Sequence, residues 1–141
     1  MPGITRVLLV ANRTVDSDEV LATLLERQAQ GSISVTLLAP AHYDIASPRG
    51  KEAALTRLQT ATDRLREAGI ETEGVVGDPD PFTAVEAIWD PERFDEVIVC
   101  TLPEHLSQWL RLDLVRRVEH LTSRVRHVVA HERSPVSDES R

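Results

Sequence analysis

The chain has 141 residues, of which 41% are hydrophobic and 4% aromatic, enough for one domain with an aliphatic core. A formal net charge of −7 argues against a nucleic-acid partner, and no apolar run reaches the roughly 20 residues of a membrane span. A single cysteine excludes an internal disulfide framework, which fits a reducing compartment. With no signal-peptide pattern in the first residues, we expect a soluble cytoplasmic protein that binds neither nucleic acid nor membranes.

Strand and helix patterns alternate along the chain. β-type apolar segments predict strands at residues 4–11, 33–39, 71–76, 96–101 and 125–131. Amphipathic segments predict helices between Asp16 and Gly31, from about Ala54 to Ala68, from Asp80 to Ile88, and from roughly Leu106 to Leu121. Residues 40–50 have the composition of a loop. The whole is predicted to be one domain, residues 1–132, with a flexible tail at 133–141.

Local signals mark several helix ends. Asp16 is the predicted N-cap of the first helix, with Glu19 three residues later completing a capping box. Gly69 is a natural C-terminal cap for the second helix, and Asp80 followed by Pro81 is typical of a helix start.

The alternation predicts a parallel sheet with right-handed crossovers. The first and fourth strands are the most uniformly apolar and should be central, whereas the third strand carries Glu71 and Glu73 and should lie at an edge. An order of 3-2-1-4-5 satisfies both conditions. We therefore predict a single doubly wound, Rossmann-like α/β fold with five parallel strands and helices on both faces.

In such a sheet, ligands bind at the carboxyl ends of the strands, next to the point where the strand order reverses. That point lies between the first and fourth strands. The candidate ligand-binding residues follow the first four strands and are Ala11, Asn12, Arg13, Ala39, Pro40, Gly77, Asp78, Cys100 and Thr101. No glycine follows Gly77, so the segment after the fourth strand lacks the residue that usually lets a phosphate approach the backbone.

Residues 6–132 resemble the universal stress protein family. The polar turn Ala11-Asn12-Arg13-Thr14 follows the first strand, as in that family, and Gly77-Asp78-Pro79 resembles the family's G-D-P at the end of the third strand. The fourth strand, the helix after it and a final strand at 127–130 have the family's lengths. The resemblance implies the fold of the adenine nucleotide alpha hydrolase-like group.

The nucleotide-binding motif of that family is not matched. Its glycines correspond here to positions near Cys100, Pro103 and Asp113, and its acidic residue after the first strand corresponds to Asn12. A carboxylate at Asp113, where the resemblance places a phosphate, would repel that phosphate. Asp113 is therefore a further candidate site residue, and we expect a divergent member that lacks the glycine-rich ATP-binding motif.

Catalytic and metal-binding patterns are absent from the sequence. Cys100 has only His105 as a local base, and a buried apolar role at a strand end is favoured for it. His127 and His131 share one face of the predicted last strand about 13 Å apart, too far to bind one metal ion. Trp109 is expected to pack on the sheet, with a partner-binding lid as the alternative. We expect no catalytic residue, no metal and no cofactor.

The last strand is a β-branched edge, and such edges pair with other chains. Universal stress proteins commonly dimerise through this strand, so the resemblance agrees with the edge argument. We expect a homodimer with antiparallel pairing near Val128 and Val129. The candidate interface residues are Val125, His127, Val128, Val129 and Ala130.

Two functions remain open. The first is a non-catalytic, dimeric stress-response protein that acts through a protein partner or a small ligand and does not bind ATP in the family manner. The alternative is an adenine-nucleotide (ATP or AMP) binding protein with a modified loop and weak hydrolysis.

Overall fold

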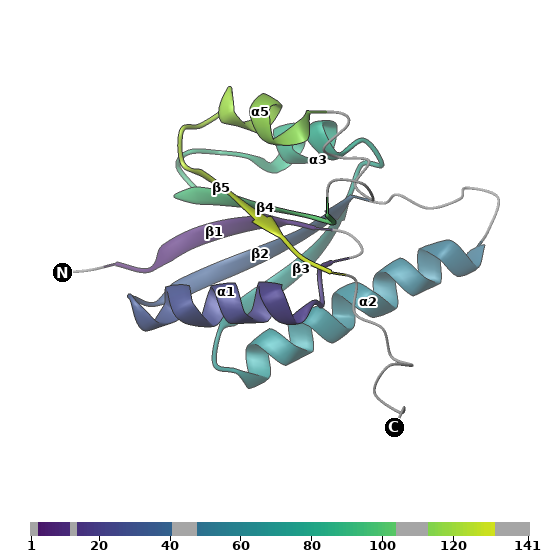
Figure 1. Ribbon diagram of the computed structural model, residues 1–141, viewed down its shortest axis with the longest axis horizontal. Helices are drawn as coiled ribbons and strands as arrows, with labels where there is room; N and C mark the ends of the chain where they lie inside the picture. Colours follow the sequence, from purple (N-terminus) through teal and green to yellow (C-terminus); the bar gives the residue numbers. More distant parts are fainter. Residues whose placement is uncertain (1–2, 12–13, 41–47, 104–112, 132–141) are drawn as a thin grey trace.

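A computed structural model describes residues 3–11, 14–40, 48–103 and 113–131. Within these residues five parallel strands form one sheet in the order β3-β2-β1-β4-β5, as predicted (Figure 1). The strands are β1 (Thr5–Val10), β2 (Ile33–Pro40), β3 (Glu71–Gly77), β4 (Glu96–Thr101) and β5 (Val125–Val129). The helices are α1 (Asp18–Ala29), α2 (Pro48–Glu67), α3 (Pro81–Ile88) and α5 (Leu114–Glu119).

Helices cover both faces of the sheet, with α1 and α2 on one side and α3 and α5 on the other (Figure 1). Alternate side chains of the central strands enter two separate cores. In β1, Val7 and Leu9 pack with α1 and α2, whereas Leu8 and Val10 pack with α3 and α5. All four are fully buried, which explains the near-continuous apolar run of this strand.

The first helix begins one residue later than the capping-box interpretation requires. Ser17, not Asp16, is the N-cap, because its Oγ accepts a hydrogen bond from the Val20 N–H at 3.1 Å. At the other end Gln30 is the C-cap and Gly31 follows it, as expected. On the second helix Gly69 has a φ of +87°, the left-handed conformation that favours glycine at a helix end.

Three other predicted boundaries are wrong. The predicted loop at 40–50 is too long, because Pro40 still belongs to β2 and α2 already begins at Pro48. β5 ends at Val129, two residues before the predicted end. The fourth predicted helix cannot run unbroken from 106 to 121, because Asp113 is left-handed and α5 begins only after it. Residues 104–112, including His105 and Trp109, and the tail at 133–141 lie outside the described residues.

No helix among the described residues combines the length and the apolar character needed to cross a membrane.

Candidate functional site

The sheet brings the predicted site residues of three strands together at its carboxyl edge. Ala11 follows β1 directly, and its N–H donates to the Leu38 carbonyl of β2 at 3.1 Å. Ala39 and Cys100 are the next-to-last residues of the neighbouring strands β2 and β4. All three side chains belong to the core under α1 and α2, with at most 4% exposure. They therefore form an apolar floor. Asn12 and Arg13 lie outside the described residues.

Cys100 is placed for packing and not for nucleophilic chemistry. Its side chain is 1% exposed, and burial raises the pKa of the thiol to about 12. A thiol with that pKa carries almost no thiolate at neutral pH, and the thiolate is the reactive form. The interpretation of Cys100 as a small buried residue agrees with this environment.

Among the candidate ligand-binding residues, Thr101 is the one whose side chain is hydrogen-bonded to β5. Its Oγ1 lies 2.8 Å from Nε2 of His127, in a hydrogen bond across the β4–β5 pair. Partial desolvation lowers the pKa of His127, so this imidazole is neutral at pH 7. His131 lies beyond the strand and contacts Glu19 of α1 at 2.7 Å. The two histidines therefore do not share a strand face. The prediction that they do is wrong, because β5 ends at Val129.

Gly77 is required by packing between β2, β3 and α3. An ideal Cβ at this position would lie 2.8 Å from Cδ1 of Leu38 and 2.9 Å from Cβ of Ala84. Any side chain would push α3 away from the sheet. The glycine of Gly77-Asp78-Pro79 thus has a structural role that needs no ligand.

The residues after Gly77 form a tight entry into α3. Asp78 Oδ1 accepts a hydrogen bond from the Asp80 N–H at 2.8 Å, and Asp80 is the N-cap, as predicted. The Asp80 carboxylate accepts hydrogen bonds from both the hydroxyl and the N–H of Thr83, which lower its pKa. Asp78 is exposed, but its carboxylate is engaged in this turn.

Asp113 is the one non-glycine residue with a left-handed backbone in the described part of the chain, with φ 58° and ψ 38°. It stands directly before α5, and its side chain forms no cap hydrogen bond. The carboxylate is well exposed and lies 3.8 Å from the Arg116 guanidinium, a loose ion pair. A glycine would adopt this backbone without strain.

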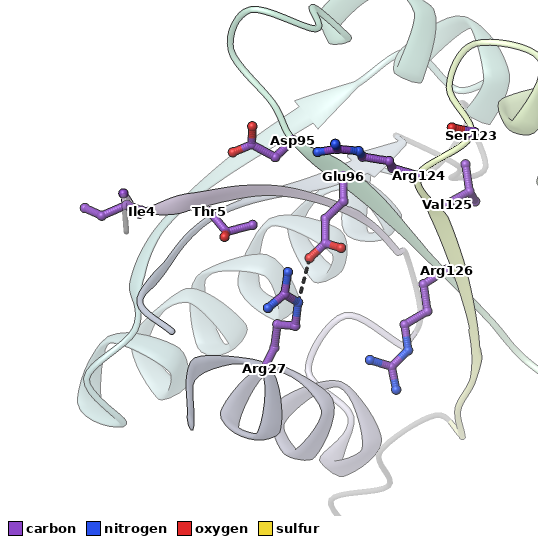
Figure 2. A pocket seen from close by; sticks show the side chains of 10 residues that line it. Ile4, Thr5, Arg27, Asp95, Glu96, Ser123, Arg124, Val125 and Arg126 are labelled. Atoms are coloured by element: carbon purple, nitrogen blue, oxygen red, sulfur yellow. Dashed lines mark hydrogen bonds and ion pairs between the residues drawn. The ribbon is translucent and has the colours of Figure 1, made fainter. Parts of the chain in front are cut away.

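The opposite edge of the sheet carries a charged pocket that the sequence did not indicate. A solvent-open cavity of about 600 Å³ lies at the amino ends of β1, β4 and β5 (Figure 2). Its charged lining residues are Arg27, Asp95, Glu96, Arg124 and Arg126. No local sequence pattern indicates this charged set, because its residues come from three separate parts of the chain. Only the two arginines, two positions apart at the start of the last strand, form a visible pattern.

The predicted interface residues lie at the edge of the sheet, since β5 pairs only with β4 in the described part of the chain. Val129 is 48% exposed, whereas Val125 and Val128 are half-buried against the two cores. Ala130 is fully buried, and its N–H donates to the Thr101 carbonyl at 2.8 Å. Its side chain therefore offers no surface to a partner.

These features define a doubly wound α/β protein with its switch point between β1 and β4. No protein-family model matches the chain, and no curated protein sequence matches it. Solved structures do match its fold, among them three universal stress proteins. The universal stress protein from Archaeoglobus fulgidus in complex with dAMP has a TM-score of 0.58 at 14% identity, over 92% of this chain and 99% of that one.

The other two structures agree. A universal stress protein in complex with cAMP has a TM-score of 0.52 at 18% identity, over 94% of this chain and 100% of that one. A family member from Burkholderia pseudomallei has a TM-score of 0.54 at 15% identity, over 91% of this chain and 98% of that one. At these identities the likeness is one of fold: the chain has the Rossmann-like α/β fold of universal stress proteins.

Proposed function

We propose that the chain is a divergent universal stress protein, a non-catalytic dimeric regulator that does not hold ATP phosphates as nucleotide-binding members do. The observation that carries the proposal is the exposed Asp113 carboxylate at the start of α5. Two like unit charges about 4 Å apart repel by roughly 1 kcal/mol in water and about 4 kcal/mol near a protein surface. A phosphate at this place would meet that repulsion, which the loosely paired Arg116 would offset in part.

The alternative is an adenine-nucleotide binding protein with a modified loop and weak hydrolysis. Two of the similar structures hold dAMP and cAMP, and Asp113 keeps the left-handed backbone that a glycine would have. The backbone path of a phosphate loop would then be retained, with a negative side chain added to it. The two proposals therefore differ in the effect of one carboxylate.

Calorimetric titration with ATP, AMP and cAMP separates them. We expect wild-type protein to show no saturable binding at ligand concentrations up to about 1 mM, where the binding free energy would be only about −4 kcal/mol. Saturable binding of a nucleotide by the wild type would overturn the first proposal and support the second. Asp113→Asn is the informative variant, because asparagine tolerates the left-handed backbone and removes only the charge.

We propose further that the dimer forms through β5. The Ala130 N–H points to β4, so the Val129 N–H, one residue earlier, points off the free edge. Light scattering should give a dimer for the wild type and for Val129→Thr, and a monomer for Val129→Pro, which lacks the edge donor. A wild-type monomer at micromolar concentration would contradict the proposal.

A further inference from the structure

The pocket at the amino ends of β1, β4 and β5 gathers cations in a chain whose net charge is −7. Three arginines and two carboxylates line it, together with the hydroxyl-bearing Thr5 and Ser123 (Figure 2). It lies at the other end of the sheet from the candidate site at the carboxyl edge, so whatever it binds is independent of the proposed function.

Both carboxylates of the pocket already have arginine partners. Glu96 Oε1 accepts a hydrogen bond from Nε of Arg27 at 2.9 Å, and each side chain is only about a quarter exposed or less. Asp95 accepts from Nε and Nη2 of Arg6, both at 3.2 Å, and from the Arg6 N–H at 2.7 Å. Arg6 is not part of the pocket lining, so the charge of one pocket carboxylate is neutralised by a residue outside the pocket.

This pairing leaves arginine donors unused. In the described part of the chain the Arg124 side chain forms no hydrogen bond or ion pair, although its charge helps to lower the pKa of Asp95. Among the described residues, the Arg126 side chain has only a 3.9 Å contact between its Nη2 and Oε1 of Glu26. Within the described part of the chain, Arg27 donates a side-chain hydrogen bond only through Nε. Its two terminal nitrogens therefore have no acceptor among the described residues.

The fold determines why these groups meet. Val125 packs with the core under α3 and α5, so its neighbours Arg124 and Arg126 are directed to the other side of the strand. Figure 2 shows Arg126 extending toward α1, the helix that carries Arg27, while Arg124 extends across toward Asp95. Arg27 extends from α1 toward the Glu96 carboxylate, to which it is bonded.

We propose that this pocket binds a phosphate group through Arg124 and Arg126, with Arg27 contributing its terminal nitrogens. The planar guanidinium donates paired hydrogen bonds that match phosphate oxygens, and such charge-assisted bonds are stronger than neutral ones. A dianion would also satisfy the excess positive charge that remains once Asp95 and Glu96 are paired. Thr5 and Ser123 also line the pocket, and their hydroxyls are two further possible donors.

The test is an NMR titration of the full-length ¹⁵N-labelled chain with inorganic phosphate, and separately with glycerol phosphate, at ionic strength held constant with chloride. We expect saturable shifts of the amide signals of residues 123–126. The double variant Arg124→Gln, Arg126→Gln should bind about a hundredfold more weakly, since each of the two lost pairs of charged hydrogen bonds costs about one order of magnitude. Tighter binding of the free ion or of the ester would identify the source of the phosphate group.

Arg57→Gln is the control, because it also removes an arginine charge and lies outside the pocket lining. Arg57 belongs to α2, which covers the other face of the sheet from α5 and so is separate from the candidate site at Asp113. This variant should bind phosphate as the wild type does. Two results would overturn the proposal: amide shifts of residues 123–126 no larger than those that chloride alone produces, or equal phosphate affinity in the double variant and the wild type. Loss of affinity in Arg57→Gln equal to that in the double variant would also overturn it, since net charge alone would then explain the binding.

Discussion

Gly77→Ala should destabilise the fold, because the added methyl group has no room between the sheet and α3. Its Cβ would lie 2.8 Å from Leu38 Cδ1 and 2.9 Å from Ala84 Cβ, well inside the separation of about 3.5–4.0 Å at which carbon atoms attract. The Leu38 methyl can rotate away. Ala84 Cβ is attached directly to the backbone of α3, so the helix must shift. Overpacking of this kind costs about 1–3 kcal/mol of unfolding free energy.

Urea unfolding followed by circular dichroism measures this cost. Gly3→Ala is the control, because a Cβ at Gly3 would meet nothing within 4 Å. Adding Ala84→Gly to Gly77→Ala removes one side of the clash. Ala84→Gly alone should cost about 1 kcal/mol from helix propensity, so the double variant should be clearly more stable than the sum of the two single effects.

Two outcomes would refute the reasoning. The first is an unfolding free energy of Gly77→Ala within about 0.5 kcal/mol of that of the wild type, which is the effect expected of a surface substitution. The close approach of α3 to the sheet would then not be rigid. If the Gly77→Ala and Ala84→Gly effects simply add, the contact between these two residues is not the source of the cost. A confirmed coupling would mean that the glycine of Gly77-Asp78-Pro79 is needed for folding whether or not any ligand binds.

Three further expectations concern local interactions. Ser17→Ala should lower the unfolding free energy by about 1 kcal/mol through loss of the α1 cap, while Ser17→Thr should keep most of it; equal urea midpoints for all three proteins would contradict the cap. The hydrogen bonds from Arg6 lower the pKa of Asp95 below its unfolded value of about 3.9, so the stability it contributes is complete above that pH and is lost as the pH falls through the folded value. Asp95→Asn should therefore flatten the acid side of the plot of urea midpoint against pH, and an unchanged slope would count against the pairing. Cys100, with its thiol pKa raised to about 12 by burial, should react with a thiol reagent at pH 8 only through unfolding, whereas rapid labelling of native protein would show the site to be open.

The sequence predicts the fold well where the signal is local. Glu71 and Glu73 place the third strand at an edge, and both residues are exposed in β3. Asp80 and Pro81 mark the start of α3 correctly, because capping and the fixed φ of proline act within one turn. The strand order follows from the same reasoning, since burial on both faces requires an apolar strand.

The sequence predicts the site less well, because the site depends on approach between distant segments. The role of Gly77 is set by Ala84 on a helix that packs back onto the sheet. The sequence pattern predicts one continuous helix through Asp113, but this residue has a left-handed backbone. An aspartate in the sequence does not by itself predict that conformation. The pairing of Arg27 with Glu96 joins residues 69 positions apart, a separation at which no periodicity is informative.

The central position of β1 also has a consequence for the growing chain. β1 is made first, yet one of its two partners, β4, begins only at Glu96, and the Arg6–Asp95 contact spans 89 positions. During synthesis β2 can pair with β1 early, while the other edge of β1 remains without its partner until most of the domain has been translated. That edge belongs to an apolar strand, and unpaired apolar edges aggregate. Nascent chains that stop before β4 should therefore depend on chaperones far more than the finished protein does.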